Sequence, residues 1–189
     1  MISSNAISER EIVIMYQYPD YLMHHGIKGM RWGKRKNTQR SVSRNKKWYG
    51  TTKNGEQIYL QRDRINPVAR GVQYLTKQDF ANYTARNSKG EKIGNIQLDR
   101  KNKNEMNTIW MDVKKNQQGK GYGQTIHNLG EQVARDFGAT KMTGEVIGIS
   151  PNMLHIAEKN HYVKVGEVKT KEMMDIWGGL TLIEKDLRP

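Results

Sequence analysis

Cysteine is absent from the 189 residues of this chain. That absence excludes a disulfide framework, a thiol nucleophile and a zinc or iron–sulfur site held by cysteine. Long apolar runs are also missing, because the longest run near the start, residues 12–16, is far shorter than the roughly 20 residues of a membrane span. The same region lacks the pattern of a secretory signal. We therefore expect no membrane association and a place in the cytosol or in a particle assembled there.

Acidic residues are scarce, with 19 Asp and Glu against 32 Lys and Arg, so the net charge is +13. The excess is uneven: residues 27–47 hold nine basic side chains and no acidic one. This pattern predicts a flexible basic arm over residues 1–54 and a compact domain over residues 55–189. Trp32, Trp48 and Tyr49 lie among these cations, so the segment 27–47 could bind nucleic acid by stacking and charge neutralisation. The alternative is a solvated linker whose aromatic residues dock on the domain itself.

From residue 55 onward, short strand-like runs alternate with turn residues, which favours packed β structure. A long helix is predicted from Tyr122 to Phe137, because its apolar residues recur at spacings of three and four and Gly138 follows as a C-terminal cap. Ser150 and Pro151 indicate the start of a second helix that ends near Asn160. Strands are predicted over residues 57–60, 79–86, 92–99, 107–113, 142–147, 162–168 and 180–187. A short helix over 65–77 is only weakly indicated, because Pro67 and Gly71 interrupt it.

A glycine-rich turn lies between the strand 107–113 and the long helix, with the sequence NQQGKGYG over residues 116–123. Glycines there allow a tight turn, and the free N–H groups at a helix start attract an anion such as a pyrophosphate. The spacing excludes a P-loop, and a hairpin-linked strand without an acidic ribose ligand excludes a dinucleotide-binding fingerprint. A tight turn without any ligand stays open as the alternative.

The order strand, Q-x-x-G-x-G, amphipathic helix resembles the acetyl-CoA-binding motif of the GNAT acyltransferase superfamily. Gln118, Gly121 and Gly123 occupy that pattern. The stretch VIGISPNMLHIAEKNHYVKVGEV resembles the family's second motif, with His161 in place of a glycine, and LTLIEKDL resembles its last strand. The resemblance covers about residues 55–187. It implies an α+β fold in which a mixed, mostly antiparallel central sheet is flanked by helices.

The same resemblance implies acetyl-CoA as the cofactor and direct attack of an amine on its thioester. The cofactor contacts it implies come from the strand and the loop, namely Met111, Val113, Gln118, Gly119, Lys120, Gly121, Tyr122 and Gly123. The candidate bases are Glu145, Asp112 and His155, each of which could also be an ordinary exposed residue. The tyrosine that often serves as general acid is replaced by Ala157, and Ser150 replaces a frequent asparagine.

A second motif lies in the arm, within residues 21–36. It reads LMHHGIKGMRWGKRK from residue 22 and closely resembles the H-x-G-x-K-G-M-[KR]-W-G motif of many tailed-phage proteins encoded among head and structural genes. The resemblance implies a docking peptide for a phage head or structural protein. Its residues are His24, His25, Gly26, Lys28, Gly29, Met30, Arg31, Trp32 and Gly33. We predict no metal site, because neighbouring histidine side chains diverge and no third ligand is nearby.

Two functions follow as hypotheses. The first is a phage-encoded N-acetyltransferase of GNAT type, tethered to a structural partner by the arm and present in the virion or in the host bacterial cytoplasm. The second is a non-catalytic protein of the same fold, associated with the virion or capsid, that binds a head protein or packaged DNA through its basic arm. The glycine loop favours the first, and Ala157 favours the second.

Overall fold

The computed structural model of the chain describes residues 42–43, 45–75 and 79–189. They belong to one compact unit, residues 37–189. The docking motif and its partner-binding residues, His24 to Gly33, lie outside the described residues. No described helix is both long enough and apolar enough to cross a membrane.

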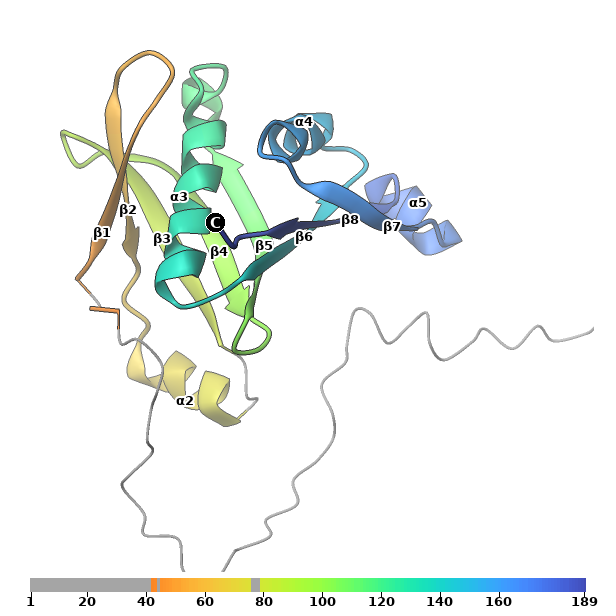
Figure 1. Cartoon of the computed structure of the whole chain (residues 1–189), viewed down its shortest axis with the longest axis horizontal. Helices are drawn as coiled ribbons and strands as arrows, with labels where there is room; N and C mark the ends of the chain where they lie inside the picture. Colours follow the sequence, from red (N-terminus) through yellow and green to blue (C-terminus); the bar gives the residue numbers. More distant parts are fainter. Residues whose placement is uncertain (1–41, 44, 76–78) are drawn as a thin grey trace, which may run out of the picture. The chain divides into compact units, whose positions relative to one another are not determined.

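An eight-stranded sheet forms the centre of this unit, with the strand order β1-β2-β3-β4-β5-β6-β8-β7 (Figure 1). In chain order the elements are β1 (Lys47–Thr51), β2 (Gln57–Arg62), α2 (Pro67–Leu75), β3 (Phe80–Asn87), β4 (Lys92–Arg100), β5 (Glu105–Val113), the 3-10 turn η1 (Lys115–Gln117), α3 (Tyr122–Asp136), β6 (Lys141–Ile147), α4 (Pro151–Lys159), β7 (Val163–Val168), α5 (Lys171–Trp177) and β8 (Leu180–Asp186). All neighbouring strands are antiparallel except β5 and β6. The predicted mixed, mostly antiparallel sheet is confirmed.

The long helix α3 supplies the crossover that the parallel pair β5 and β6 requires, because parallel strands cannot be joined by a tight hairpin. Its buried side chains include Ile126, Leu129 and Val133, which are at most 1% exposed, and they pack on one face of the sheet. Gly130 allows close contact there, since a Cβ at this position would lie 2.8 Å from Ile96 Cδ1. The opposite face carries mainly polar side chains, as is common for an antiparallel sheet with one solvated face.

The compact unit begins earlier in the chain than the expected boundary at residue 55. Strand β1 pairs with β2, and Trp48 is 4% exposed in the core. Its indole donates to Asp136 Oδ2 at 2.6 Å, and its ring packs edge-on against Tyr83. Lys46 pairs with the same carboxylate, and Lys47 lies over the Tyr59 ring. The prediction that the arm extends to residue 54 was therefore wrong: the aromatic and basic residues at its end dock on the domain.

One helix was only weakly indicated by the sequence, and another was missed. Helix α2 forms in spite of Pro67 and Gly71, because Pro67 is its first residue, where a missing N–H costs nothing, and Asn66 Oδ1 accepts from Ala69 N at 2.7 Å. Helix α5 was not predicted at all. The Thr170 hydroxyl caps it by accepting from Met173 N, and Gly178 ends it in the left-handed region at φ 67°.

Candidate functional site

The glycine loop leads from the end of β5 through η1 into α3. Gly119 and Gly121 have φ values of 77° and 84°, in the left-handed region that side chains with a Cβ disfavour. Gly121 is the N-cap of α3 and offers no capping side chain. The first N–H groups of the helix therefore lack an intrahelical acceptor. They point out of the N-terminus of α3, which is also the positive end of the helix dipole.

Side chains of the loop brace it through hydrogen bonds. Gln118 Nε2 donates to Val113 O at 3.0 Å, and Lys120 Nζ donates to Gln117 Oε1 at 3.1 Å. The buried Tyr122 hydroxyl donates to Glu56 in the β1–β2 turn, and this carboxylate raises the pKa of Tyr122 to about 12. Gln118 and Tyr122 thus use their side chains to hold the loop in shape.

The exposed face of the loop suits a polyphosphate. A Cβ on Gly119 would meet no atom within 4 Å, so the approach to the backbone there is open. Lys114, Lys115 and Lys120 are exposed along the loop, and no acidic residue lies in the first turn of α3. Because free N–H groups, a helix dipole and cations coincide, the residues present fit the pyrophosphate of acetyl-CoA.

Beside the loop, β5 and β6 separate. They pair over four residue pairs only, from Glu105 with Lys141 to Thr108 with Gly144. Beyond that point β5 continues to Val113 and β6 to Ile147 without pairing to each other, and the two strands diverge in Figure 1. The Thr108 Oγ1 atom, at the last paired position, is buried and has no hydrogen-bond partner among the residues described. A buried hydroxyl is therefore left unsatisfied by the described residues at the point where the strands part.

A β-bulge in β5 decides which side chains face the loop. Leu98 pairs with Thr108 but Gln97 pairs with Trp110, so Ile109 is the extra residue and the alternation shifts. Met111 and Val113 consequently lie on the α3 side, where Val113 Cγ2 would be 3.9 Å from a Cβ on Gly123. The structure thus places both strand residues implied as cofactor contacts on the same side as the glycine loop.

Trp110 and Asp112 lie on the opposite face of the sheet, paired with Gln97 and Asn95. Glu145 follows Gly144, the last residue of β6 that pairs with β5. It lies on that same face of the sheet and pairs with Leu182 of β8. Asp112 and Glu145 are exposed, and Trp110 is 52% exposed. The structure therefore brings two of the three candidate bases to one face at the gap. Trp110 was not predicted as a site residue, because a bulge leaves no clear signal in the sequence alternation.

His155 lies apart from these carboxylates. It is exposed on α4, the helix whose Ile156 packs against the start of α3 beside Gly123. Ala157 on the same helix is 2% exposed, so the position implied for a proton-donating tyrosine is part of the core.

Comparison with solved structures identifies this architecture. A GNAT family acetyltransferase from Elizabethkingia anophelis, solved with acetyl-CoA bound, superposes with a TM-score of 0.56 at 15% identity, covering 68% of this chain and 97% of that one. Mutant forms of a spermidine/spermine N-acetyltransferase from Vibrio cholerae give 0.56 at 13% identity, with 69% and 95% covered. Nourseothricin acetyltransferase gives 0.50 at 16% identity, with 58% of this chain covered; the chain spans 66% of that protein. The chain has the GNAT fold.

At the level of sequence, residues 15–39 match a family of unknown function, DUF7211. A search of curated proteins found no match. The family match is confined to the arm, whereas the GNAT fold is formed by the unit that comes after it.

A buried polar cluster fastens α4 of the GNAT fold to α3. Asn160, the C-cap of α4, donates to His127 Nδ1 at 2.8 Å and accepts from Gln124. Glu131, 4% exposed, accepts from Lys185 Nζ at 2.7 and 2.8 Å and from Arg135. Burial lowers the pKa of His127 to about 4, the Glu131 charge opposing this effect, so the imidazole is neutral and accepts from Asn160. The cluster holds α4 beside the glycine loop.

His161 ends α4 in an unusual conformation for a residue other than glycine, with φ 61°. The second motif of the GNAT family has a glycine at this place, and the backbone shows why: Tyr162 N donates back to Ala157 O across the helix end, which requires a left-handed residue between them. His161 therefore adopts the left-handed conformation that a glycine would adopt without strain.

Because His127 is buried in its neutral form, we expect the stability of the fold to depend on pH. The unfolded chain binds a proton at His127 near pH 6.5 and the folded chain only near pH 4, so stability falls as the pH drops through this interval. We expect His127 to contribute a loss of about 3 kcal/mol between pH 7 and pH 4. Urea unfolding of wild type and His127→Gln at several pH values measures it. His155→Gln, on the exposed face of α4, is the matched control, and equal slopes for wild type and His127→Gln would contradict the assignment.

Proposed function

We propose that the chain is an N-acetyltransferase that binds acetyl-CoA at the glycine loop. The observation that carries this proposal is the coincidence of an uncapped helix start at Gly121 with the separation of β5 and β6 beside it. The loop N–H groups and the flanking lysines bind the pyrophosphate. Met111 and Val113, on the loop side of β5, line the path of the pantetheine arm.

Acetyl-CoA, when bound, supplies a thioester carbonyl that a neutral amine can attack. The residues of this chain then have two tasks, to orient the acceptor and to accept its proton. Glu145 and Asp112 lie on the face of the sheet away from the loop, so we propose that the amine approaches from that face. Glu145 is our first candidate for the base, because it directly follows the last pair between β5 and β6. The carboxylate takes the proton that the nitrogen loses as the carbon–nitrogen bond forms.

A protein donor to the leaving thiolate is not part of this proposal. Ala157 occupies the position implied for a tyrosine, and the nearby Tyr162 is 7% exposed, with a pKa raised by burial. Solvent can protonate a thiolate at neutral pH, since a thiol has a pKa near 8.5. Ala157 nevertheless favours the alternative of a non-catalytic GNAT-fold protein of the virion. Cofactor binding separates these functions.

We further propose that the motif within residues 21–36 docks the chain on a phage head or structural protein, which would place it in a virion or in the host cytoplasm. The support is the motif itself and the confinement of the family match to residues 15–39, which indicates a segment distinct from the GNAT unit. Nucleic acid remains a proposed partner of the basic segment 27–47, although Lys46 and Lys47 already bind side chains of the domain.

Gly121→Val tests the cofactor site. A β-branched residue disfavours the φ of 84° and places a side chain against Lys53, whose Cβ would be 3.7 Å from the new Cβ, so the loop must shift. We therefore expect acetyl-CoA affinity to fall at least about tenfold in calorimetric titration of the full chain. Gly90→Val is the matched control, because Gly90 has a φ of 82° in the β3–β4 turn, outside the glycine loop, and a Cβ there would meet no atom within 4 Å. No binding by folded wild type would favour the non-catalytic protein, and equal affinity of Gly121→Val would exclude the loop as the site.

Glu145→Gln tests the base. With spermidine and L-lysine as probe amines, we expect CoA release to slow about 100-fold, because no carboxylate then takes the proton that the nitrogen loses as the carbon–nitrogen bond forms. Acetyl-CoA affinity should not change. Asp112→Asn and His155→Asn are assayed in parallel, and Glu172→Gln on the exposed side of α5 is the control. Full activity of Glu145→Gln would remove Glu145 from the mechanism.

Replacement of Met30 and Trp32 together by Ala tests the docking motif. We expect the thermal unfolding of the domain to be unchanged, because both residues precede the unit 37–189, and recovery of the protein in sedimented phage particles to be lost. Met174 and Trp177, an exposed pair on α5, are replaced by Ala as the control. Equal recovery of both variants would contradict the docking role.

A further inference from the structure

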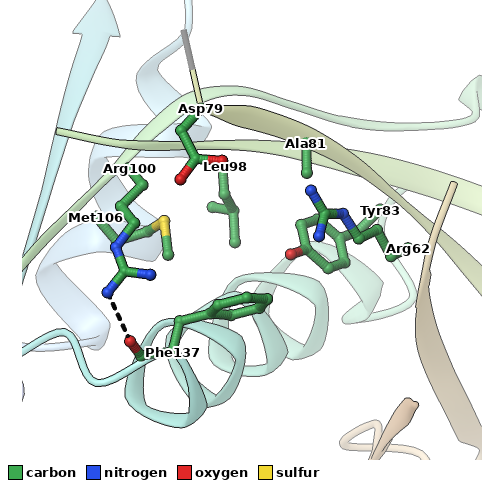
Figure 2. Close-up of a pocket in the computed structure, with 8 residues that line it drawn as sticks. All are labelled: Arg62, Asp79, Ala81, Tyr83, Leu98, Arg100, Met106 and Phe137. Atoms are coloured by element: carbon green, nitrogen blue, oxygen red, sulfur yellow. Dashed lines mark hydrogen bonds between the residues drawn. The ribbon is translucent and has the colours of Figure 1, made fainter. Parts of the chain in front are cut away.

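A pocket lies at the end of α3 opposite to the glycine loop. It measures about 270 Å³ including its mouth and is bounded by the ends of β2 and β4, the starts of β3 and β5, and Phe137 at the C-terminus of α3 (Figure 2). Because α3 has 15 residues at about 1.5 Å each, roughly 22 Å separate its two ends. The pocket is therefore separate from the proposed acetyl-CoA site, and its ligand does not depend on that proposal.

The floor of the pocket is apolar and belongs to the core. Leu98 and Met106 are 1% and 4% exposed, and the Phe137 ring forms the adjacent wall. Arg100, at one side, is already engaged, since its guanidinium donates to Phe137 O at 2.9 Å and so satisfies a carbonyl at the end of α3. Arg100 therefore stabilises the C-terminal end of α3, and we do not assign it to ligand binding.

Three polar groups face the apolar floor without partners of their own. Tyr83 is 2% exposed, and its hydroxyl points into the pocket in Figure 2; within residues 42–43, 45–75 and 79–189 no hydrogen bond reaches this oxygen. Burial raises the pKa of Tyr83 to about 12, so the hydroxyl remains a donor at neutral pH. Arg62 and Asp79 flank it, and in the described part of the chain neither side chain has an ion pair within 4.0 Å.

Arg62 and Asp79 place opposite charges at the same pocket without forming an ion pair with each other. Arg62 and Asp79 both act electrostatically on Tyr83, the first lowering and the second raising its pKa, yet they do not pair with each other. The Tyr83 hydroxyl opens to the pocket without a hydrogen-bond partner among the described residues, so a ligand acceptor can bind it there, and the two charges beside it add attraction of both signs. A molecule with both charges and a short apolar group complements all three features at once.

We propose that this pocket binds a small zwitterion of the α-amino-acid type with an aliphatic side chain. Arg62 and the Tyr83 hydroxyl donate to the ligand carboxylate, because a guanidinium and a hydroxyl are both suited to a carboxylate. Asp79 accepts from the ligand ammonium group. The aliphatic side chain lies on Leu98, Met106 and Phe137.

Calorimetric titration of the full chain with L-leucine tests the ligand class. We expect saturable binding, and binding at least about tenfold weaker for 3-methylbutylamine, which lacks the carboxylate, and for 4-methylpentanoate, which lacks the ammonium group. No saturable binding of L-leucine overturns the proposal. Equal binding of 4-methylpentanoate overturns it in favour of a simple carboxylate site, and equal binding of both analogues shows an apolar site only.

Single-atom and single-charge variants test the residues. Tyr83→Phe removes a hydroxyl that makes no hydrogen bond among the described residues, so we expect wild-type thermal stability and at least about tenfold weaker leucine binding. Tyr49→Phe, on an exposed ring, is its control, and Arg64→Gln is the control for Arg62→Gln. Acetyl-CoA affinity should be the same in all four variants, which keeps this test apart from that of the glycine loop. Unchanged leucine affinity in Tyr83→Phe would overturn the assignment.

Discussion

Four residue pairs join β5 to β6, and the arrangement of the whole unit depends on that short parallel contact. Because the pair is parallel, the chain must cross over between the strands, and α3 is the crossover. Because the pairing ends at Thr108 and Gly144, the strands part beside the first turn of α3. One connection therefore creates both a helix start with free N–H groups and an open sheet edge next to it.

The bulge at Ile109 divides the chemistry between the two faces of the sheet. It turns Met111 and Val113 toward α3 and leaves Trp110 and Asp112 on the other face with Glu145. In the proposed reaction, the cofactor arm and the acceptor therefore approach the gap from opposite faces of the sheet.

Helix α3 links the remaining features. Its start follows the glycine loop, its middle holds α4 through His127 and β8 through Glu131, and its end binds β1 through Asp136. Strand β1 in turn covers the core with Trp48 and brings Glu56 and Lys53 beside the loop. The turn between β1 and β2 consequently helps to shape the glycine loop, and the pocket at Arg62, Tyr83 and Asp79 lies at the other end of the same helix.

Local pattern in the sequence determined most of the elements and the glycine loop. The period of α3, the proline start of α4 and the turn around Gly90 are encoded within a few neighbouring residues, so the predicted helices and strands agree closely with the structure. Tertiary structure decided what depends on distant partners: Trp48 is core because Asp136 and Tyr83 lie beside it. The face on which Trp110 and Asp112 lie results from a bulge in the pairing with β4, and the cavity around Tyr83 from the meeting of four strands with a helix end. Neither the face of Trp110 and Asp112 nor the cavity can be predicted from local periodicity, because each arises only when segments far apart in the chain pack together.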